Sequence, residues 1–361
     1  MQSMKQCPKC FLTITQIFGL VSLQAILNSV IFPARNPSYV LLCCMNFTPL
    51  MALAGLETLR SSDGADEGHG SNRKKMVFLL TDGQPSKGCR PHEGELAALK
   101  TYLESHPNFH CQIATFGFGY KLDSELLEEI SKEGGGVFSF ISDAPMVGNV
   151  FTRALANVLT THSQRAMIHL TPMNGSKLVG LPSGGFKSEV APWGLVVNVG
   201  PLQYGQYREI IVPVEMPSDS SAPFLDVTLE YGDPVQRISL EADEREVDGG
   251  ALSVEVAMLR AQFVDTCAAL LKQKPLPCAG GAEPLMRALM QRFESSDAAG
   301  DERVAAMYAD IVGRMSKAMD GADRFKRWGS HYIRGLLRAH ELQQCTKCVN
   351  VFLITVRIDH V

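Results

Sequence analysis

The sequence predicts an α/β fold: an open parallel sheet, followed by an antiparallel β-sandwich and then a helical bundle. The first observation is an apolar run, residues 76–80, that leads into Thr81 and Asp82, as a buried parallel strand does where it ends in a polar turn. The second is a series of short β-type runs separated by Gly, Pro and Ser turns over residues 166–240. The third is the helical spacing of apolar residues from Ala251 onward.

The end of the first strand is the main candidate site. Ligands of open α/β sheets bind at the carboxyl ends of the strands. Asp82 stands at that position, and Gly83 lets the backbone turn away. An aspartate on a rigid element supplies an oxygen ligand of the kind that Mg²⁺ prefers. Asp-Gly is also a common turn pair, so the alternative is that Asp82 only starts a turn.

The composition is that of a globular protein with more than one domain. The chain has 361 residues, of which 45% are hydrophobic and 20% charged, and this length suffices for two or three domains with their own cores. The net charge of −4 gives no reason to expect a nucleic-acid partner. Ten cysteines are too few for a disulfide framework in a chain of this length, so we expect reduced thiols.

Residues 1–45 form an atypical hydrophobic segment. Residues 11–32 carry no charge, with Lys9 before them and Arg35 after, which is the flank pattern of a membrane-spanning helix or signal anchor. Scattered Thr, Ser, Gln and Asn residues lower the hydrophobicity of this stretch, so a buried helix or a segment foreign to the fold is the alternative. We favour a cytoplasmic location and keep membrane anchoring through residues 11–32 as an alternative.

Several motifs together resemble the von Willebrand factor type A (VWA) domain, which is a Rossmann-like, doubly wound fold. Residues 77–86 (VFLLTDGQPS) resemble its central strand and third metal-site loop, and residues 111–119 (CQIATFGFG) resemble the next strand. Residues 122–160 resemble the helix, short strand and closing helix that follow. The resemblance implies a VWA-like domain over residues 46–163.

The resemblance also implies a metal-ion-dependent adhesion site, for which two protein ligands are recognisable. Residues 46–60 resemble the second metal-site loop and the helix after it, so Thr48 matches a threonine ligand and Asp82 matches the third-loop aspartate. The Asp-x-Ser-x-Ser motif that ends the usual first strand does not occur upstream of Asp82. Because so few oxygens would hold the ion, we expect Mg²⁺ or Mn²⁺ to bind weakly, at a degenerate site. The chain resembles a VWA protein whose beginning is lost or replaced.

The second half resembles the module that accompanies VWA domains in proteins with U-box or Hint domains. Its β-sandwich is expected over residues 166–245, with runs at residues 167–170, 194–199, 207–214, 224–231 and 235–240. Its helical bundle is expected over residues 250–345, with helices at residues 254–271, 283–293, 301–319 and 323–344. The tail, residues 346–361, departs from the family pattern.

Histidines and cysteines offer weaker candidate sites. His331 and His340 fall on opposite faces of the last predicted helix, so they cannot share one site, and packing or capping roles are favoured. Two CxxC pairs of zinc-knuckle type are present, Cys7 with Cys10 and Cys345 with Cys348. They lie at opposite ends of the chain in the two atypical segments, so we do not expect zinc.

These features predict a non-enzymatic protein-interaction module. The partner, a protein that offers an acidic group, is expected at the carboxyl edge of the VWA sheet around Thr48, Asp82 and Gly83, with the ion between them if it is held. No Gly-x-Ser-x-Gly elbow or comparable catalytic arrangement stands out. The alternatives are a part of a ubiquitin-ligase or Hint-type processing protein, and a membrane-anchored scaffold.

Overall fold

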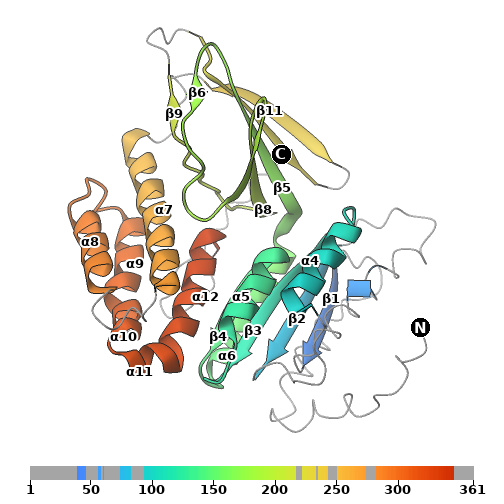
Figure 1. The fold of residues 1–361 in the computed structure, drawn as a ribbon, viewed down its shortest axis with the longest axis vertical. Helices are drawn as coiled ribbons and strands as arrows, with labels where there is room; N and C mark the ends of the chain where they lie inside the picture. The colour runs from blue at the N-terminus through green and yellow to red at the C-terminus, as the bar shows by residue number, and fades with distance from the viewer. Residues whose placement is uncertain are drawn as a thin grey trace.

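The computed structural model of the chain has three parts: a parallel sheet with helices, an antiparallel β module and a group of closing helices (Figure 1). This order confirms the predicted α/β fold class. The structure describes residues 39–45, 56–57, 60, 74–82, 93–216, 222–232, 235–242, 250–273 and 282–344.

In the described part of the chain, the parallel sheet has four strands in the order β1-β2-β3-β4. They are β1 (Tyr39–Met45), β2 (Lys74–Thr81), β3 (Cys111–Phe118) and β4 (Gly135–Ile141). Within the described residues the sheet already includes Tyr39, ahead of the boundary expected at residue 46, because residues 39–45 pair in parallel with β2. The middle strands are almost continuously apolar, as strands covered on both faces are.

Helices cover both faces of this sheet, and alternate residues of β2 contact different helices. In β2, Val77 and Leu79 share a core with α4 (Glu95–Ser105) and α5 (Ser124–Glu133). Phe78 and Leu80 instead share a core with α6 (Met146–Leu159). This two-residue alternation is the geometry of a strand inside a doubly wound sheet.

The β module follows α6 directly and contains a five-stranded antiparallel sheet in the order β11-β10-β5-β8-β7. Its strands are β5 (Thr161–Pro172), β7 (Lys187–Ala191), β8 (Gly194–Gln203), β10 (Leu225–Tyr231) and β11 (Gln236–Ala242). The second layer is smaller than the sequence predicts. Among the described residues it consists of the short strands β6 (Lys177–Leu178) and β9 (Val214–Glu215), with Ile210 and Val212 also packed on the sheet.

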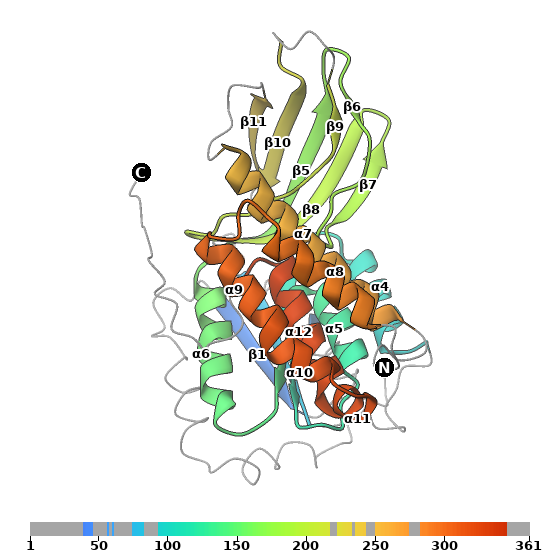
Figure 2. The same cartoon turned by 90° about the vertical axis from the view of Figure 1, so that its left-hand side faces the viewer.

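The closing helices begin beneath the β module, at the level of α7 (Figure 2). They are α7 (Gly250–Lys272), α8 (Ala282–Glu294), α9 (Glu302–Asp310), α10 (Ser316–Met319), α11 (Ala322–Arg324) and α12 (Ser330–Glu341). The helices predicted at residues 301–319 and 323–344 are each interrupted by a π-helical turn, at Ile311–Met315 and Phe325–Gly329. Apolar spacing alone does not distinguish such turns from an α-helix.

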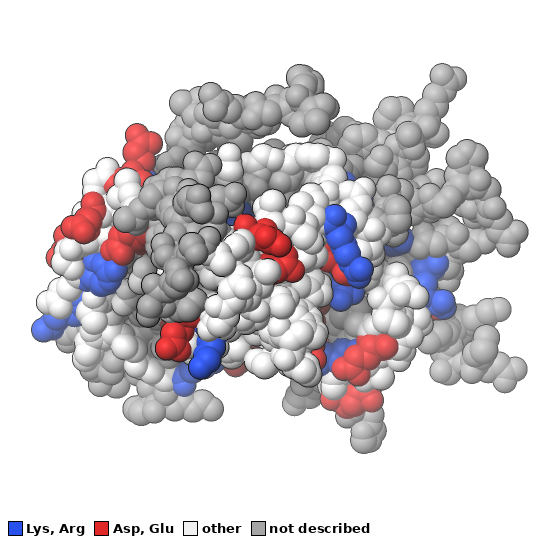
Figure 3. Space-filling view, turned by 90° about the horizontal axis from the view of Figure 1, so that it is seen from above, with Lys and Arg blue, Asp and Glu red and all other residues white. Residues whose placement is uncertain are grey.

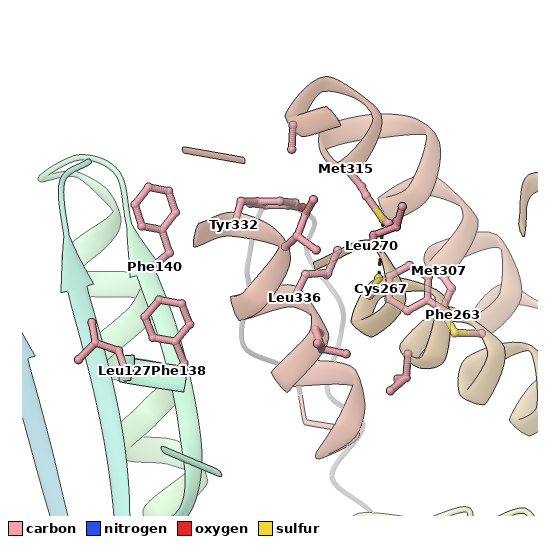
Figure 4. Close-up of a cluster of buried hydrophobic side chains, with 14 of the residues drawn as sticks. Leu127, Phe138, Phe140, Phe263, Cys267, Leu270, Met307, Met315, Tyr332 and Leu336 are labelled. Atoms are coloured by element: carbon pink, nitrogen blue, oxygen red, sulfur yellow. Dashed lines mark hydrogen bonds between the residues drawn. The ribbon is translucent and has the colours of Figure 1, made fainter. Parts of the chain in front are cut away.

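Helix α12 lies between the parallel sheet and the other closing helices. One side packs on β4 and α5, and the other packs on α7. Figure 4 shows Tyr332 and Leu336 between Phe138 and Phe140 of the sheet and Leu270 of α7. Each large apolar side chain buried in this way contributes about 1.5–3 kcal/mol relative to exposure, so α12 joins the cores of the two parts.

Charged residues of α12 pair with charged residues of α5 at buried or half-buried positions. Arg334 contacts Glu128 at 2.6 Å, and Lys132 contacts both Glu128, at 2.7 Å, and Glu341, at 3.0 Å. Arg338 contacts Glu341 at 3.0 Å. Removing one member of a buried ion pair strands its partner and costs about 3–5 kcal/mol. This chain of ion pairs therefore fixes how α12 sits on α5.

His331, at the start of α12, is also buried. Its Nδ1 lies 2.6 Å from the hydroxyl of Ser124, and its Nε2 lies 3.4 Å from the carbonyl oxygen of Tyr120. Burial lowers the pKa of His331, and the carbonyl of Tyr120 opposes this effect. The folded state therefore favours the neutral form of the imidazole.

Within the described residues, every helix is too short or too polar to cross a membrane. Residues 11–32, for which the sequence offers a membrane-spanning helix, lie outside the described residues.

The packing of the last π-helical turn on α10 predicts the effect of a single methyl group. A Cβ atom at Gly329 would clash with the backbone of Ala318, so we expect Gly329→Ala to lower the free energy of unfolding by about 1–3 kcal/mol. Gly148, in α6, has open space at this position, so Gly148→Ala should be neutral or stabilising by up to about 1 kcal/mol. Urea unfolding measures both changes, and equal stability of the two variants would contradict the packing.

The burial of His331 predicts a pH-dependent stability. Because its pKa is lower in the folded chain than in the unfolded chain, the unfolded chain binds the proton first, and stability falls as the pH drops below about 6.5. We expect His331→Gln to lose less stability than the wild type between pH 7.5 and pH 5.5. Urea unfolding at both pH values measures this, and the carboxylates titrate in both proteins, so the difference reports His331. Equal losses would contradict the prediction.

Candidate functional site

Asp82 stands at the carboxyl edge of the parallel sheet, where the sequence predicts the site. Thr81 ends β2 with a buried side chain, and the next residue, Asp82, is an exposed bend. The register places Met45 of β1 beside Leu80 of β2, so both strands leave the sheet at this edge. Thr48 and Gly83, the other residues predicted for the site, lie outside the described residues.

The described residues do not by themselves form a divalent-ion site. Mg²⁺ prefers six oxygen ligands in octahedral geometry. Nowhere among the described side chains do three or more His, Cys, Asp or Glu residues converge as metal ligands. Asp82 thus offers one carboxylate, and the described residues supply no cage around it.

Two cysteines, Cys111 and Cys267, and the two histidines of the last helix, His331 and His340, have packing roles. Burial raises the pKa of the Cys111 thiol to about 12 and raises that of Cys267 further, which disfavours the thiolate that a nucleophile or metal ligand needs. His331 faces α5, whereas the ring of His340 lies 4.5 Å from that of Phe263 on α7. The two histidines point to different neighbours, as the sequence predicts. The paired CxxC cysteines lie outside the described residues.

A cleft that the sequence analysis did not identify lies at the opposite edge of the parallel sheet. We call it the junction cleft. It has a volume of about 470 Å³, and its walls come from residues 103–111, residues 132–135, the β module and the end of α12. Cys111 and Gly135 begin β3 and β4, so the cleft faces the amino ends of the strands. Stretches that are far apart in the sequence build it, and only tertiary folding brings them together.

Charges of both signs are distributed over the face seen in Figure 3, where lysine and arginine side chains alternate with aspartate and glutamate among the described residues. A protein that binds nucleic acid through its backbone usually carries a basic stripe. The described side chains on this face form no such stripe. The junction cleft is distinguished by the charges of its own lining residues, not by a charge pattern over the whole face.

A comparison with protein families gives one match within the closing helices. The family described as "VWA / Hh protein intein-like" matches residues 301–349, which include α9 to α12. A comparison with the curated proteins found no match.

Three solved structures are similar to this chain over much of its length. A von Willebrand factor type A protein from Catenulispora acidiphila is 15% identical with a TM-score of 0.47, and the match covers 71% of this chain and 61% of that one. The ArnB paralog VWA2 from Sulfolobus acidocaldarius is 13% identical with a TM-score of 0.37, covering 78% and 68%. The human COPII-coat protein Sec24c is 14% identical with a TM-score of 0.45, covering 81% and 41%.

This chain spans less than two thirds of the Catenulispora protein. The resemblance to the VWA family rests on the motifs and on the family match in the closing helices. The strands after residue 74 are parallel and lie side by side in chain order, as expected for the predicted open parallel sheet, and the family match falls on the module expected behind them. The motifs, the strand order and this match together support a von Willebrand factor type A domain protein that carries the VWA-associated module.

Proposed function

We propose that this chain is a non-enzymatic interaction module, in the cytoplasm, that binds a partner protein at the carboxyl edge of its parallel sheet around Asp82. The VWA fold is in general a protein-interaction module. The observation that carries the proposal is the exposed side chain of Asp82, directly after a buried strand. Strand β2 is hydrogen-bonded to β1 on one side and to β3 on the other, which fixes the backbone that presents this carboxylate.

The charge of Asp82 determines which partner group suits this edge. A bare carboxylate repels an acidic partner, whereas a bound divalent cation attracts one. In our proposal Mg²⁺ or Mn²⁺ binds weakly to Asp82 with Thr48, and an acidic side chain of the partner adds a further oxygen. Whether the ion is bound therefore determines which partner group this edge attracts. The affinity of the edge for the ion is the property to measure first.

The proposal of a non-enzymatic role is supported by the state of the most reactive side chains described. Cys267 is buried with a raised thiol pKa, and His331 is hydrogen-bonded inside the core. Neither has the exposed, activated environment of a catalytic group. A role in ubiquitin ligation or Hint-type processing, or as a membrane-anchored scaffold, remains the alternative.

The proposed site predicts weak metal binding that depends on Asp82. We expect calorimetric titration of the full chain with Mn²⁺ or Mg²⁺ to show saturable binding with a dissociation constant of roughly 1 mM, because few protein oxygens hold the ion. Asp82→Ala should abolish this binding. Asp297→Ala, which removes an exposed carboxylate from the helical part, is the matched control and should bind as the wild type does.

Two outcomes would count against the metal-dependent form of the proposal. If the wild type binds neither ion, the edge acts without a metal and an acidic partner is excluded. If Asp82→Ala and the wild type bind equally well, the ion binds elsewhere on the chain.

A further inference from the structure

The junction cleft carries a surplus of positive charge. Five of its lining side chains are lysine or arginine, whereas three are glutamate. Two of the glutamates are already paired: Glu341 contacts Lys132 and Arg338, each at 3.0 Å, and Glu133 contacts Lys187 at 2.9 Å. The third, Glu104, is exposed to solvent. The remaining cations of the lining, Arg208 and Arg165, account for the surplus.

Arg208 is a fixed cation in the wall of the cleft. Its Nη1 donates to the carbonyl oxygen of Leu342 at the end of α12, and its Nη2 donates to that of Val199 in β8, at 2.5 Å. The guanidinium also lies over the ring of Phe186, 5.7 Å from its centre. These contacts hold the side chain between two parts of the molecule, so little conformational entropy would be lost on binding a ligand.

The charge of Arg208 has no acidic counterpart within the described residues. Its two terminal nitrogens bond neutral carbonyls, and its buried Nε has no hydrogen-bond partner. Burial lowers the pKa of Arg208 to about 10, and the positive charges of Arg338 and Arg260 contribute to this, so the group still carries its charge at neutral pH. A buried charge without a counter-charge is costly, and an anion in the cleft would compensate it.

The other walls suit a ligand with an apolar body. Phe109, Pro107 and Pro201 line the cleft beside Phe186. Its volume of about 470 Å³ lies within the usual range for small-molecule sites. Arg165 is exposed and the side chain of Lys187 is 58% exposed, so these two cations lie where a ligand would enter.

We propose that the junction cleft binds a small ligand that bears a doubly charged phosphate monoester on an apolar body. Arg208 is the anchoring cation, and Arg165 and Lys187 are the cations at the mouth. A dianion matches the surplus of two positive charges better than a single carboxylate does. The guanidinium group offers several N–H donors in a fixed plane, a geometry suited to phosphate oxygens.

The test uses phenyl phosphate as the probe and benzoate as a singly charged ligand with the same ring. We expect calorimetric titration of the full chain, in a phosphate-free buffer with EDTA, to show saturable binding of phenyl phosphate and at least tenfold weaker binding of benzoate. Arg208→Met should weaken phenyl phosphate binding about tenfold or more, which is the loss expected for a charged hydrogen bond. Arg208→Lys, which keeps the charge, should recover part of the affinity.

Two further variants keep the test decisive if Arg208→Met fails to fold. The double change Arg165→Gln with Lys187→Gln removes the exposed cations at the mouth and should weaken binding several-fold, whereas Arg237→Gln, on β11 and outside the cleft, should not. Asp82→Ala should bind phenyl phosphate as the wild type does, so this result is independent of the metal proposal. Absence of saturable binding, equal affinity for benzoate, or an unchanged affinity in the double variant would overturn the proposal.

Discussion

The burial of α12 between two cores is the constraint on which the rest of this structure depends. An amphipathic surface helix has one apolar face, whereas α12 packs on the parallel sheet with one side and on α7 with the other. Several of its polar residues, His331, Arg338 and Glu341, are therefore buried as well. Arg338 donates from Nε to the carbonyl oxygen of Gly136 in β4, at 2.9 Å, and pairs with Glu341. The buried charges are tolerated because each finds a partner in a neighbouring element.

The same helix fastens the β module to the other two parts. Gln206 donates to the carbonyl oxygens of Leu342 and Gln343 at the end of α12, at 3.0 and 2.8 Å. The side-chain amide of Gln343 exchanges two hydrogen bonds with the backbone of Glu209. Both candidate sites thus belong to one connected body. Asp82 lies at one edge of the parallel sheet, and the junction cleft lies at the other, where α12 ends.

The sequence was sufficient for elements whose signal is local. The apolar run at β2 and the strand at residues 111–118 follow from pattern and resemblance, because a strand covered on both faces is apolar along its whole length. The prediction of a strand at residues 207–214 was wrong over most of its length. The alternation of this run is real, since Ile210 and Val212 pack inward. Its backbone forms isolated hydrogen bonds: Glu209 bonds the side chain of Gln343, and the carbonyl oxygens of Ile211 and Pro213 accept from the loops around β6.

The two candidate sites also differ in how far the sequence predicts them. The motif placed Asp82 at the sheet edge from the sequence, whereas its role as a site residue stays a prediction, and Thr48 and Gly83 lie outside the described residues. The junction cleft could not be found, since Arg208, Arg165 and Lys187 come from different segments and each alone reads as an ordinary surface cation. Only the position of α12 brings their segments together around one cavity.

Native-state hydrogen exchange tests most directly whether α12 joins the parts into one body. The amides of α12, β3 and α7 should then exchange with the same opening free energy, equal to that of global unfolding, because exposing α12 breaks both cores. An opening free energy for α12 several kcal/mol below that of β3 would show that the helix detaches while the sheet stays folded. That result would contradict the central role assigned to α12.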